Sequence, residues 1–222
     1  MAFVVAIDGP AGTGKGTITK LLAKELGLVN IDTGAMYRCV TLQALRKGIH
    51  SIEEKEKLIE IARNIEIQIE NHNGNQQILL NGEDVTTEIR SLEVSKFVSP
   101  VSSIPEIREL MVNLQRKMAE GKNVIMEGRD ITTVVFPNAN VKIYLDADVE
   151  ERARRRYEEN KEKGMKTTFE ETLEAVKTRD YNDMHKAVGA LKIAEDAIVV
   201  DTTKMTIEEV KEKVKELILA VK

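Results

Sequence analysis

The chain has 222 residues, of which 42% are hydrophobic and 32% charged, a composition that suits one compact globular domain with its own core. Acidic residues (37) outnumber lysines and arginines (33), and a net charge of −4 argues against non-specific binding to nucleic acids or membrane surfaces. The single cysteine cannot form an internal disulfide, and Gly9-Pro10 interrupts the N-terminal apolar run too early for a signal peptide. No apolar run approaches the ~20 residues that span a bilayer. We therefore expect a cytoplasmic protein without a disulfide or a membrane partner.

Apolar residues alternate between runs typical of buried parallel strands and spacings typical of amphipathic helices. In chain order the predicted elements are a strand at 3–7, a helix at 18–26, a strand at 28–31, helices at 35–47 and 53–63, a β-hairpin within 64–90, a helix at 105–120, strands at 123–126 and 141–145, helices from 149 to about 157 and at 169–184, a strand at 197–200 and a helix at 207–221. This alternation predicts an α/β fold with a parallel sheet flanked by helices.

One segment departs from this alternation. Isoleucines alternate with polar residues over 65–69, a cluster of turn-forming residues spans 71–75, and an apolar run follows at 77–80. The pattern predicts a β-hairpin with one solvated face. We therefore divide the chain into a core domain and a small β-containing insert, with bounds of 1–63 and 91–222 for the core and 64–90 for the insert.

A glycine-rich turn follows the first strand and precedes the first helix. Its glycines permit backbone angles that turn several N–H groups inward, and the positive end of the helix dipole lies at the same place. Lys15 adds a charge that can reach the β- and γ-phosphates of a nucleotide. The alternative is an ordinary turn, but such turns rarely have three glycines and a lysine at these offsets. We expect ATP to bind at Gly9, Pro10, Ala11, Gly12, Thr13, Gly14, Lys15, Gly16 and Thr17.

The turn differs from the general P-loop motif, in which Ser or Thr follows the lysine directly. Here Gly16 follows Lys15, and Thr17 comes one place later, a variant that resembles the nucleoside monophosphate kinases. The hydroxyl that usually contacts Mg²⁺ is thus missing or displaced. We still expect ATP to act with Mg²⁺, because transfer needs neutralised β- and γ-oxygens, but we predict no residue as a metal ligand.

Three further motifs combine an arginine with a carboxylate or an aromatic ring. Residues 32–38, Asp-Thr-Gly-Ala-Met-Tyr-Arg, follow a predicted strand, as do residues 127–130, Glu-Gly-Arg-Asp. Ligands of open α/β sheets bind at such carboxyl ends of strands. Arg179 and Asp183 share one face of a predicted helix. The alternatives are plain helix capping in the first motif and a surface ion pair in the third.

Together these motifs resemble the bacterial cytidylate kinase family over nearly the whole chain. The resemblance rests on the stretches at 32–38, 128–137, 179–183 and 194–203 and on the insert at 64–90. It implies a P-loop NTPase-type fold with a small insert that binds the nucleoside monophosphate, and a basic helical lid. The implied activity is ATP-dependent phosphorylation of CMP and dCMP to CDP and dCDP.

The resemblance also implies roles for individual residues. Lys15 and Arg129 would act in the transfer. A site that hydrogen-bonds the exocyclic amine of cytosine would leave buried polar groups unpaired with uracil, which discriminates strongly. Thr33, Tyr37 and Arg38 would contact the acceptor nucleotide, Arg38, Arg108 and Arg129 would hold its phosphate, and Asp130, Arg179 and Asp183 would bind the cytosine or the sugar.

The chain departs from the family pattern at a few places. Lys186 stands where the family usually has an arginine, so it keeps the charge of this substrate-binding position but loses the planar fork. Ala190 replaces a usual proline, and Thr132 stands where glycine is common.

Four arginines between 152 and 156 lie on the basic helix that begins at 149. A lid over about 152–168 would exclude water and bring guanidinium groups to the transferring phosphoryl group. Arg152 and Arg156 share a helix face and are the catalytic candidates. The alternative is a solvated helix whose glutamates pair with these arginines.

The expected reaction is direct, in-line transfer of the γ-phosphoryl group from ATP·Mg²⁺ to a phosphate oxygen of CMP, without a covalent enzyme intermediate or a general base. Two alternatives remain: a P-loop kinase for another small acceptor, and a GTPase-like switch. The switch would need a guanine-binding Asn-Lys-x-Asp motif, and the stretch at 160–163 lacks its aspartate. We expect a monomer that binds ATP and CMP or dCMP and no nucleic acid.

Overall fold

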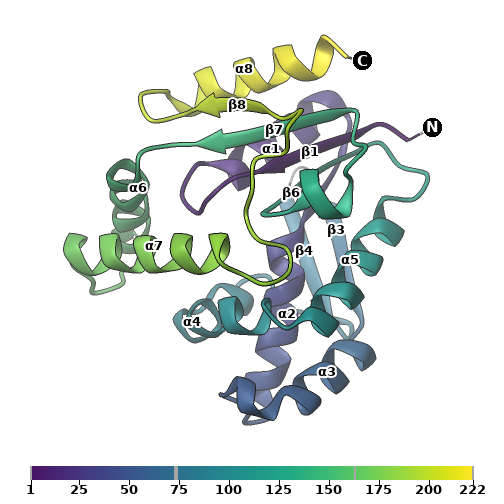
Figure 1. The fold of residues 1–222 in the computed structure, drawn as a ribbon, viewed down its shortest axis with the longest axis vertical. Helices are drawn as coiled ribbons and strands as arrows, with labels where there is room; N and C mark the ends of the chain where they lie inside the picture. The colour runs from purple at the N-terminus through teal and green to yellow at the C-terminus, as the bar shows by residue number, and fades with distance from the viewer. Residues whose placement is uncertain (1, 73–74, 163, 222) are drawn as a thin grey trace.

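The computed structural model describes residues 2–72, 75–162 and 164–221 of the chain. Within them, the larger sheet has five parallel strands in the order β2-β6-β1-β7-β8 (Figure 1). The strands are β1 (Val4–Asp8), β2 (Val29–Asp32), β6 (Val124–Gly128), β7 (Val141–Asp146) and β8 (Ile198–Asp201). The predicted α/β fold with a parallel sheet is confirmed, and its central strand, β1, is the one that leads into the glycine-rich turn.

Helices flank the sheet. The described α-helices are α1 (Lys15–Leu26), α2 (Thr33–Arg46), α3 (Lys55–Asn64), α4 (Leu92–Val101), α5 (Pro105–Ala119), α6 (Val149–Glu162), α7 (Phe169–Met184) and α8 (Ile207–Leu219), and the short helical turns are η1 (Ile52–Glu54), η2 (Glu88–Arg90) and the π-helical η3 (Ile131–Val135). Gly27, in the left-handed conformation with φ of 66°, ends α1 as predicted. Pro105 lies at the start of α5, where its missing N–H has no helical partner to lose.

The two faces of the sheet have separate hydrophobic cores. Val5 and Ile7 of β1 pack with α1 and α8, whereas Ala6 packs with α5 and η3. Successive side chains of a strand point to opposite faces, so the continuous apolar run of β1 contributes to both cores. The buried layers fix the carboxyl ends of the strands relative to one another, and the motifs of the sequence follow these ends.

The predicted hairpin forms a second sheet of β3 (Ile67–His72), β4 (Asn75–Leu80) and β5 (Glu83–Asp84), paired antiparallel. Residues 73 and 74 of its predicted turn lie outside the described residues. Ile78 and Leu80 are buried in a core that α2, α3, α4 and α5 also line. The sheet therefore packs as part of a larger helical unit, and the division at 64–90 stays a prediction.

Helices α6 and α7 contact each other and lie beside the carboxyl ends of the strands, across from α4 (Figure 1). The predicted lid, 152–168, comprises most of α6 and the segment between α6 and α7, of which residue 163 lies outside the described residues. A capping box of Thr168 and Glu171 begins α7. None of the described helices combines the length and the apolar composition that a bilayer span requires.

Candidate functional site

The glycine-rich turn lies at the carboxyl end of the central strand and leads into α1. Gly9 adopts φ of 147°, and a Cβ there would lie 2.0 Å from the carbonyl oxygen of Leu145 on β7, so only glycine fits. Lys15 Nζ donates to Pro10 O at 2.6 Å and to Thr13 Oγ1 at 3.3 Å. The lysine side chain thus folds back over the turn, as a residue that contacts a phosphate in this loop must.

Electrostatics around Lys15 favour an anion. Burial lowers the pKa of Lys15, and Arg129 lowers it further, although Glu127 and Asp8 act in the opposite direction. The side chain is only 5% exposed. A polyphosphate bound at the turn would stabilise the charged lysine, because it adds negative charge next to a buried cation.

Glu127, which belongs to the motif at 127–130 but has no predicted role, lies at the end of β6 beside the turn. A Cβ on Gly16 would lie 3.0 Å from Glu127 Oε1, and Thr19 Oγ1 donates to the same oxygen at 3.5 Å. Burial raises the pKa of Glu127, with a further contribution from Asp32, while Lys15 opposes it. One signal in the sequence could have identified it: Glu127 directly follows a predicted strand, and ligands of open α/β sheets bind at the carboxyl ends of strands.

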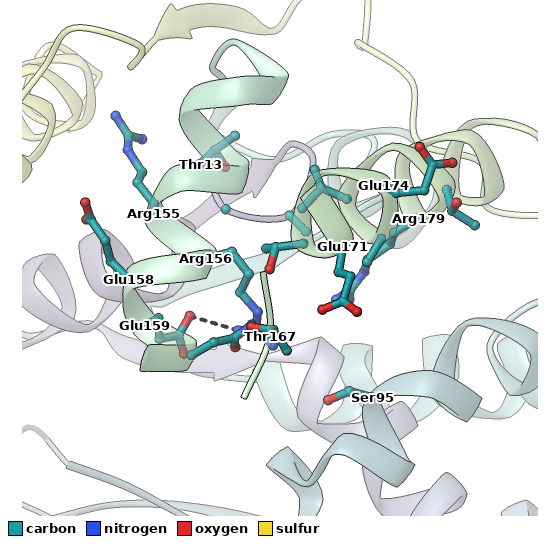
Figure 2. Close-up of a pocket in the computed structure, with 18 of the residues that line it drawn as sticks. Thr13, Ser95, Arg155, Arg156, Glu158, Glu159, Thr167, Glu171, Glu174 and Arg179 are labelled. Carbon is teal, nitrogen blue, oxygen red and sulfur yellow. Dashed lines mark hydrogen bonds and ion pairs between the residues drawn. The ribbon is translucent and has the colours of Figure 1, made fainter. Parts of the chain in front are cut away.

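Four predicted arginines face one another across the site: Arg38, Arg129, Arg156 and Arg179. Burial lowers the pKa of Arg179 to about 10, and Arg129, Arg38 and Arg156 add to the effect while Asp183 opposes it. Burial likewise lowers the pKa of Arg38 to about 10, with contributions from Arg156 and Arg129. Figure 2 shows Arg156 and Arg179 projecting from neighbouring helices into one pocket. This arginine cluster carries more positive charge than its surroundings neutralise.

Arg108 and Asp130 form a buried ion pair, with exposed fractions of 4% and 5%. Arg108 also donates to Ser102 O at 3.0 Å and lies over the ring of Tyr37, with 5.3 Å from Cζ to the ring centroid. Burial lowers the pKa of Arg108, but Tyr37 and Asp130 outweigh it and the net pKa is raised. The pair presents guanidinium donors next to a carboxylate acceptor.

Asp183 joins three predicted cations. Arg129 Nε lies 2.7 Å from Oδ2, Lys186 Nζ lies 3.1 Å from Oδ1, and Arg179 Nε lies 4.0 Å from Oδ2. Burial by itself would raise the pKa of Asp183, but the three cations outweigh it and hold the pKa well below its usual range. Lys186 also donates to Ser102 Oγ at 3.0 Å, so the lysine in place of arginine still connects Asp183 to the segment before α5.

The two catalytic candidates of the lid differ. Arg152 is buried, with Nε donating to Ala147 O at 2.8 Å, NH1 donating to Ala11 O at 3.2 Å, and an ion pair with Asp180 at 2.7 Å. It ties the phosphate turn to α6 and α7. Arg156 is 37% exposed and pairs with Glu159 at 2.8 Å, as the alternative of a charged helix expected, yet it lies in the pocket.

Residues of the motif at 32–38 also stabilise the fold. Asp32 caps α2 by accepting from Ala35 N at 3.0 Å, so the capping alternative holds for this residue. Thr33 Oγ1 donates to Glu127 O at 2.7 Å and fixes the end of β6. Burial raises the pKa of Tyr37 to about 12, so its ring enters the site as a neutral wall.

A cavity of about 1180 Å³ extends from the phosphate turn between α4, α6, α7 and α8 (Figure 2). Thr13 from the turn, Ser95 from α4, Arg155 and Arg156 from α6, and Arg179 from α7 all line it. Its walls therefore join the predicted ATP site to the arginine cluster. The volume exceeds that of a usual small-molecule site and is sufficient for more than one ligand.

A family model described as cytidylate kinase matches residues 5–220. A cytidylate kinase from Caldicellulosiruptor saccharolyticus is 53% identical over 213 residues, which cover 96% of this chain and 94% of that protein. One from Caldanaerobacter subterraneus subsp. tengcongensis is 53% identical over 214 residues, covering 96% and 93%. An uncharacterized protein from Eubacterium ventriosum, of known structure, is similar with a TM-score of 0.54 and 12% identity over 99% of each chain, a likeness of fold alone.

Proposed function

The chain belongs to the cytidylate kinase family, and we propose that it transfers the γ-phosphoryl group of ATP to CMP and dCMP, giving CDP and dCDP. The observation that carries the proposal is that Arg156 and Arg179 of the arginine cluster line the same cavity as Thr13 and Thr17 of the phosphate turn. Two phosphate groups that must approach each other repel, and converging guanidinium groups offset that repulsion.

On the donor side, the amides of residues 9–17 and the α1 N-terminus would hold the ATP phosphates. Lys15 already lies over the turn, so it needs little rearrangement to reach the β- and γ-oxygens. Arg152 supports this side by linking Ala11 to Asp180. We propose that Arg152 positions the turn and that Arg156, the more exposed of the two, contacts the transferring group.

On the acceptor side, Arg38, Arg129 and Arg179 would hold the phosphate of CMP. The family resemblance groups Arg108 with them, but the buried pairing of Arg108 with Asp130 supports a different role. The Watson–Crick edge of cytosine has an amine donor next to two acceptors, which complements a carboxylate next to a guanidinium. We propose that Arg108 and Asp130 bind the base, against the ring of Tyr37, while Asp183 and Lys186 contact the sugar.

Mg²⁺ would act with ATP, and the residues present fit it. Glu127 is a carboxylate whose charge burial disfavours, so a cation beside it would be stabilising. Its carboxyl group lies next to Gly16, where the general motif has a hydroxyl side chain. We propose that Glu127 holds the ion, directly or through water, with Asp32 nearby; the ion would neutralise the β- and γ-oxygens of ATP.

The proposal extends to the setting of the enzyme. A net charge of −4 supports a protein without a nucleic-acid partner, and the single buried Cys39 supports a reducing, cytoplasmic location. We also propose that the protein acts as a monomer.

The test is a coupled ADP-release assay with ATP·Mg²⁺ and each of CMP, dCMP, UMP, AMP and GMP. We expect turnover confined largely to CMP and dCMP. Equal or better turnover with AMP or UMP would contradict the assignment of Arg108 and Asp130 to cytosine. No turnover with any of the five would contradict the proposed reaction.

A further inference from the structure

Asp8, the last residue of β1, is fully buried and has no assigned role in the reaction. Its carboxylate accepts three hydrogen bonds: from Ile131 N at 3.0 Å, from Thr132 N at 2.7 Å and from Thr132 Oγ1 at 2.6 Å. A charge-assisted hydrogen bond is stronger than a neutral one, and a buried carboxylate needs such partners. The buried Asp8 carboxylate therefore strongly constrains the positions of the groups that donate to it, on Ile131 and Thr132.

The donors belong to η3, the π-helical turn directly after Arg129 and Asp130. At the other end of this turn, Arg116 of α5 donates from Nε to Val135 O at 3.0 Å and from NH2 to Val134 O at 2.8 Å. An acid thus lies at the amide end of the turn and a base at its carbonyl end, the arrangement that favours a helical dipole. Both anchors come from other elements, so η3 is held by the tertiary structure.

Strand pairing fixes the residue that precedes Arg129 and Asp130, which is Gly128 at the end of β6. Asp8 lies opposite Gly128 in the register of β1 and β6, and the hydrogen bonds of its carboxylate reach past the two intervening residues to 131 and 132. Arg129 and Asp130 therefore lie between a sheet contact and a carboxylate contact of one and the same residue. Their side chains then extend to Asp183 and Arg108 respectively.

We infer that Asp8 is a positioning residue: through the amides of Ile131 and Thr132 and the hydroxyl of Thr132, it holds Arg129 and Asp130 in register with the phosphate turn. Asp8 is followed directly by Gly9, so the same residue ends the donor strand and orients the acceptor segment. A displacement of about 1 Å between reacting groups lowers the rate of a transfer strongly, so the link acts on the approach of acceptor to donor.

The charge balance around Asp8 agrees with this role. Burial raises the pKa of Asp8, while the hydrogen bonds from Thr132 and Ile131 lower it and Asp130 raises it slightly. Asp8 in turn raises the pKa of Arg129 and of Lys15, one cation on each side of the transfer. An asparagine in its place would bring an N–H₂ group against backbone N–H donors, because an amide has only one acceptor oxygen.

The inference rests on the proposed function, and Thr132 offers the gentlest test. Thr132→Val removes the hydroxyl and keeps the shape, whereas Thr132→Ser keeps the hydroxyl. For Thr132→Val we expect the KM for CMP to rise about tenfold, with the Kd of ATP within about twofold of the wild type, because a hydrogen bond to a charged group is lost on the acceptor segment only. Thr132→Ser should restore the wild-type KM.

Thr206→Val is the matched control, since Thr206 Oγ1 also donates to a carboxylate, that of Glu209, at 2.8 Å, but at the exposed N-terminus of α8. It should leave both constants unchanged. Asp8→Asn should raise the KM for CMP more than Thr132→Val and lower kcat as well. If that variant does not fold, the threonine series alone decides.

The outcomes separate two failures. A wild type active on CMP, with KM for CMP unchanged in Thr132→Val despite a folded protein, would overturn the inference and leave the proposed function intact. The inference also fails if Thr132→Val and Thr132→Ser lower the melting temperature equally and shift no kinetic constant. That outcome would show that Thr132 has a structural role only. A wild type inactive on every monophosphate would overturn the proposed function together with acceptor positioning.

Discussion

Two sets of buried arginines in the molecule are in opposite electrostatic states. Arg108 is neutralised by Asp130, and its pKa is raised. Arg38 and Arg179 lie among other arginines, and burial together with these neighbours lowers the pKa of each to about 10. The first arrangement is complete without a ligand, whereas the second is stabilised by an anion that arrives.

Under the proposed function, this difference corresponds to two kinds of recognition. Excess positive charge attracts any phosphate and does not distinguish nucleotides. A neutral pair of fixed donors and acceptors adds little attraction, but it rejects a base whose edge does not match, because the mismatch leaves buried groups unpaired. Affinity for the phosphate and selection of the base should therefore be separable by mutation.

The largest effect is expected at Lys15, which serves the donor side of the excess charge. Lys15→Met should lower kcat about 1000-fold, because a buried charge aimed at the transferring phosphate is lost. The assay is ADP release at saturating ATP and CMP. Lys24→Met, a change at an exposed lysine of the same helix, is the control; an equal loss in both variants would contradict a local role for Lys15.

The next effect tests the neutral pair. Asp130→Asn should lower kcat/KM for CMP about 100-fold, because Arg108 is left buried without its counterion. The kcat/KM for UMP, which should be much lower in the wild type, should fall less. The ratio of kcat/KM for CMP to kcat/KM for UMP should therefore decrease. Asp196→Asn, at an exposed aspartate paired with Lys142, is the control. An unchanged ratio would show that the base is bound elsewhere.

A smaller effect tests the arginine cluster. Arg179→Met should raise the KM for CMP about tenfold with the CMP-to-UMP ratio unchanged, because one of several phosphate contacts is lost. The KM for CMP should rise steeply with salt concentration in the wild type and less steeply in the variant, because salt screens the excess positive charge that attracts the phosphate. Arg154→Met, which breaks pairs with Glu151 and Glu158, should match the wild type.

The smallest effect concerns stability and its dependence on pH. Asp183 has a pKa below its usual range in the folded chain, so its contribution to stability is present above the unfolded pKa, about 4, and is lost as the pH falls. Asp183→Asn should lower the melting temperature by about 8 °C at pH 7, and the gap should narrow below about pH 4. Glu195→Gln controls for net charge, and a gap independent of pH would contradict the ion-pair explanation.

Much of the fold could be predicted because it follows local patterns. The α7 bounds, 169–184, and the parallel strands follow from apolar periodicity alone. Helix α4 was missed because its β-branched residues and Pro100 disfavour a helix locally. Burial of Val94 and Val98 against the neighbouring helices outweighs that preference.

The π-helical turn η3 was also missed, for a related reason. Its sequence, Ile-Thr-Thr-Val-Val, is typical of a strand, and its anchor Asp8 lies 123 residues away along the chain. No local pattern could connect the two. The hydroxyl of Thr132, which departs from the family pattern, acquires a partner only in three dimensions.

The candidate site shows the same division. Motifs and family resemblance supplied Lys15, Arg38 and Arg179, and in the structure Arg179 is near enough to the other two to act on their charges. The pairing of Arg108 with Asp130 joins separate elements and was not predicted. Glu127 could have been proposed, because an acid at the end of a predicted strand is visible in the sequence, but its place beside the phosphate turn and its contact with Gly16 could not.

That contact links two positions that lie far apart in the sequence. A side chain at position 16 would meet the Glu127 carboxylate at 3.0 Å, so the carboxylate would move by a few tenths of an ångström. A designer who restores the general motif with Gly16→Ser should therefore obtain a folded protein whose Glu127 carboxylate is displaced, and Glu127→Asp is the second substitution that would relieve the crowding.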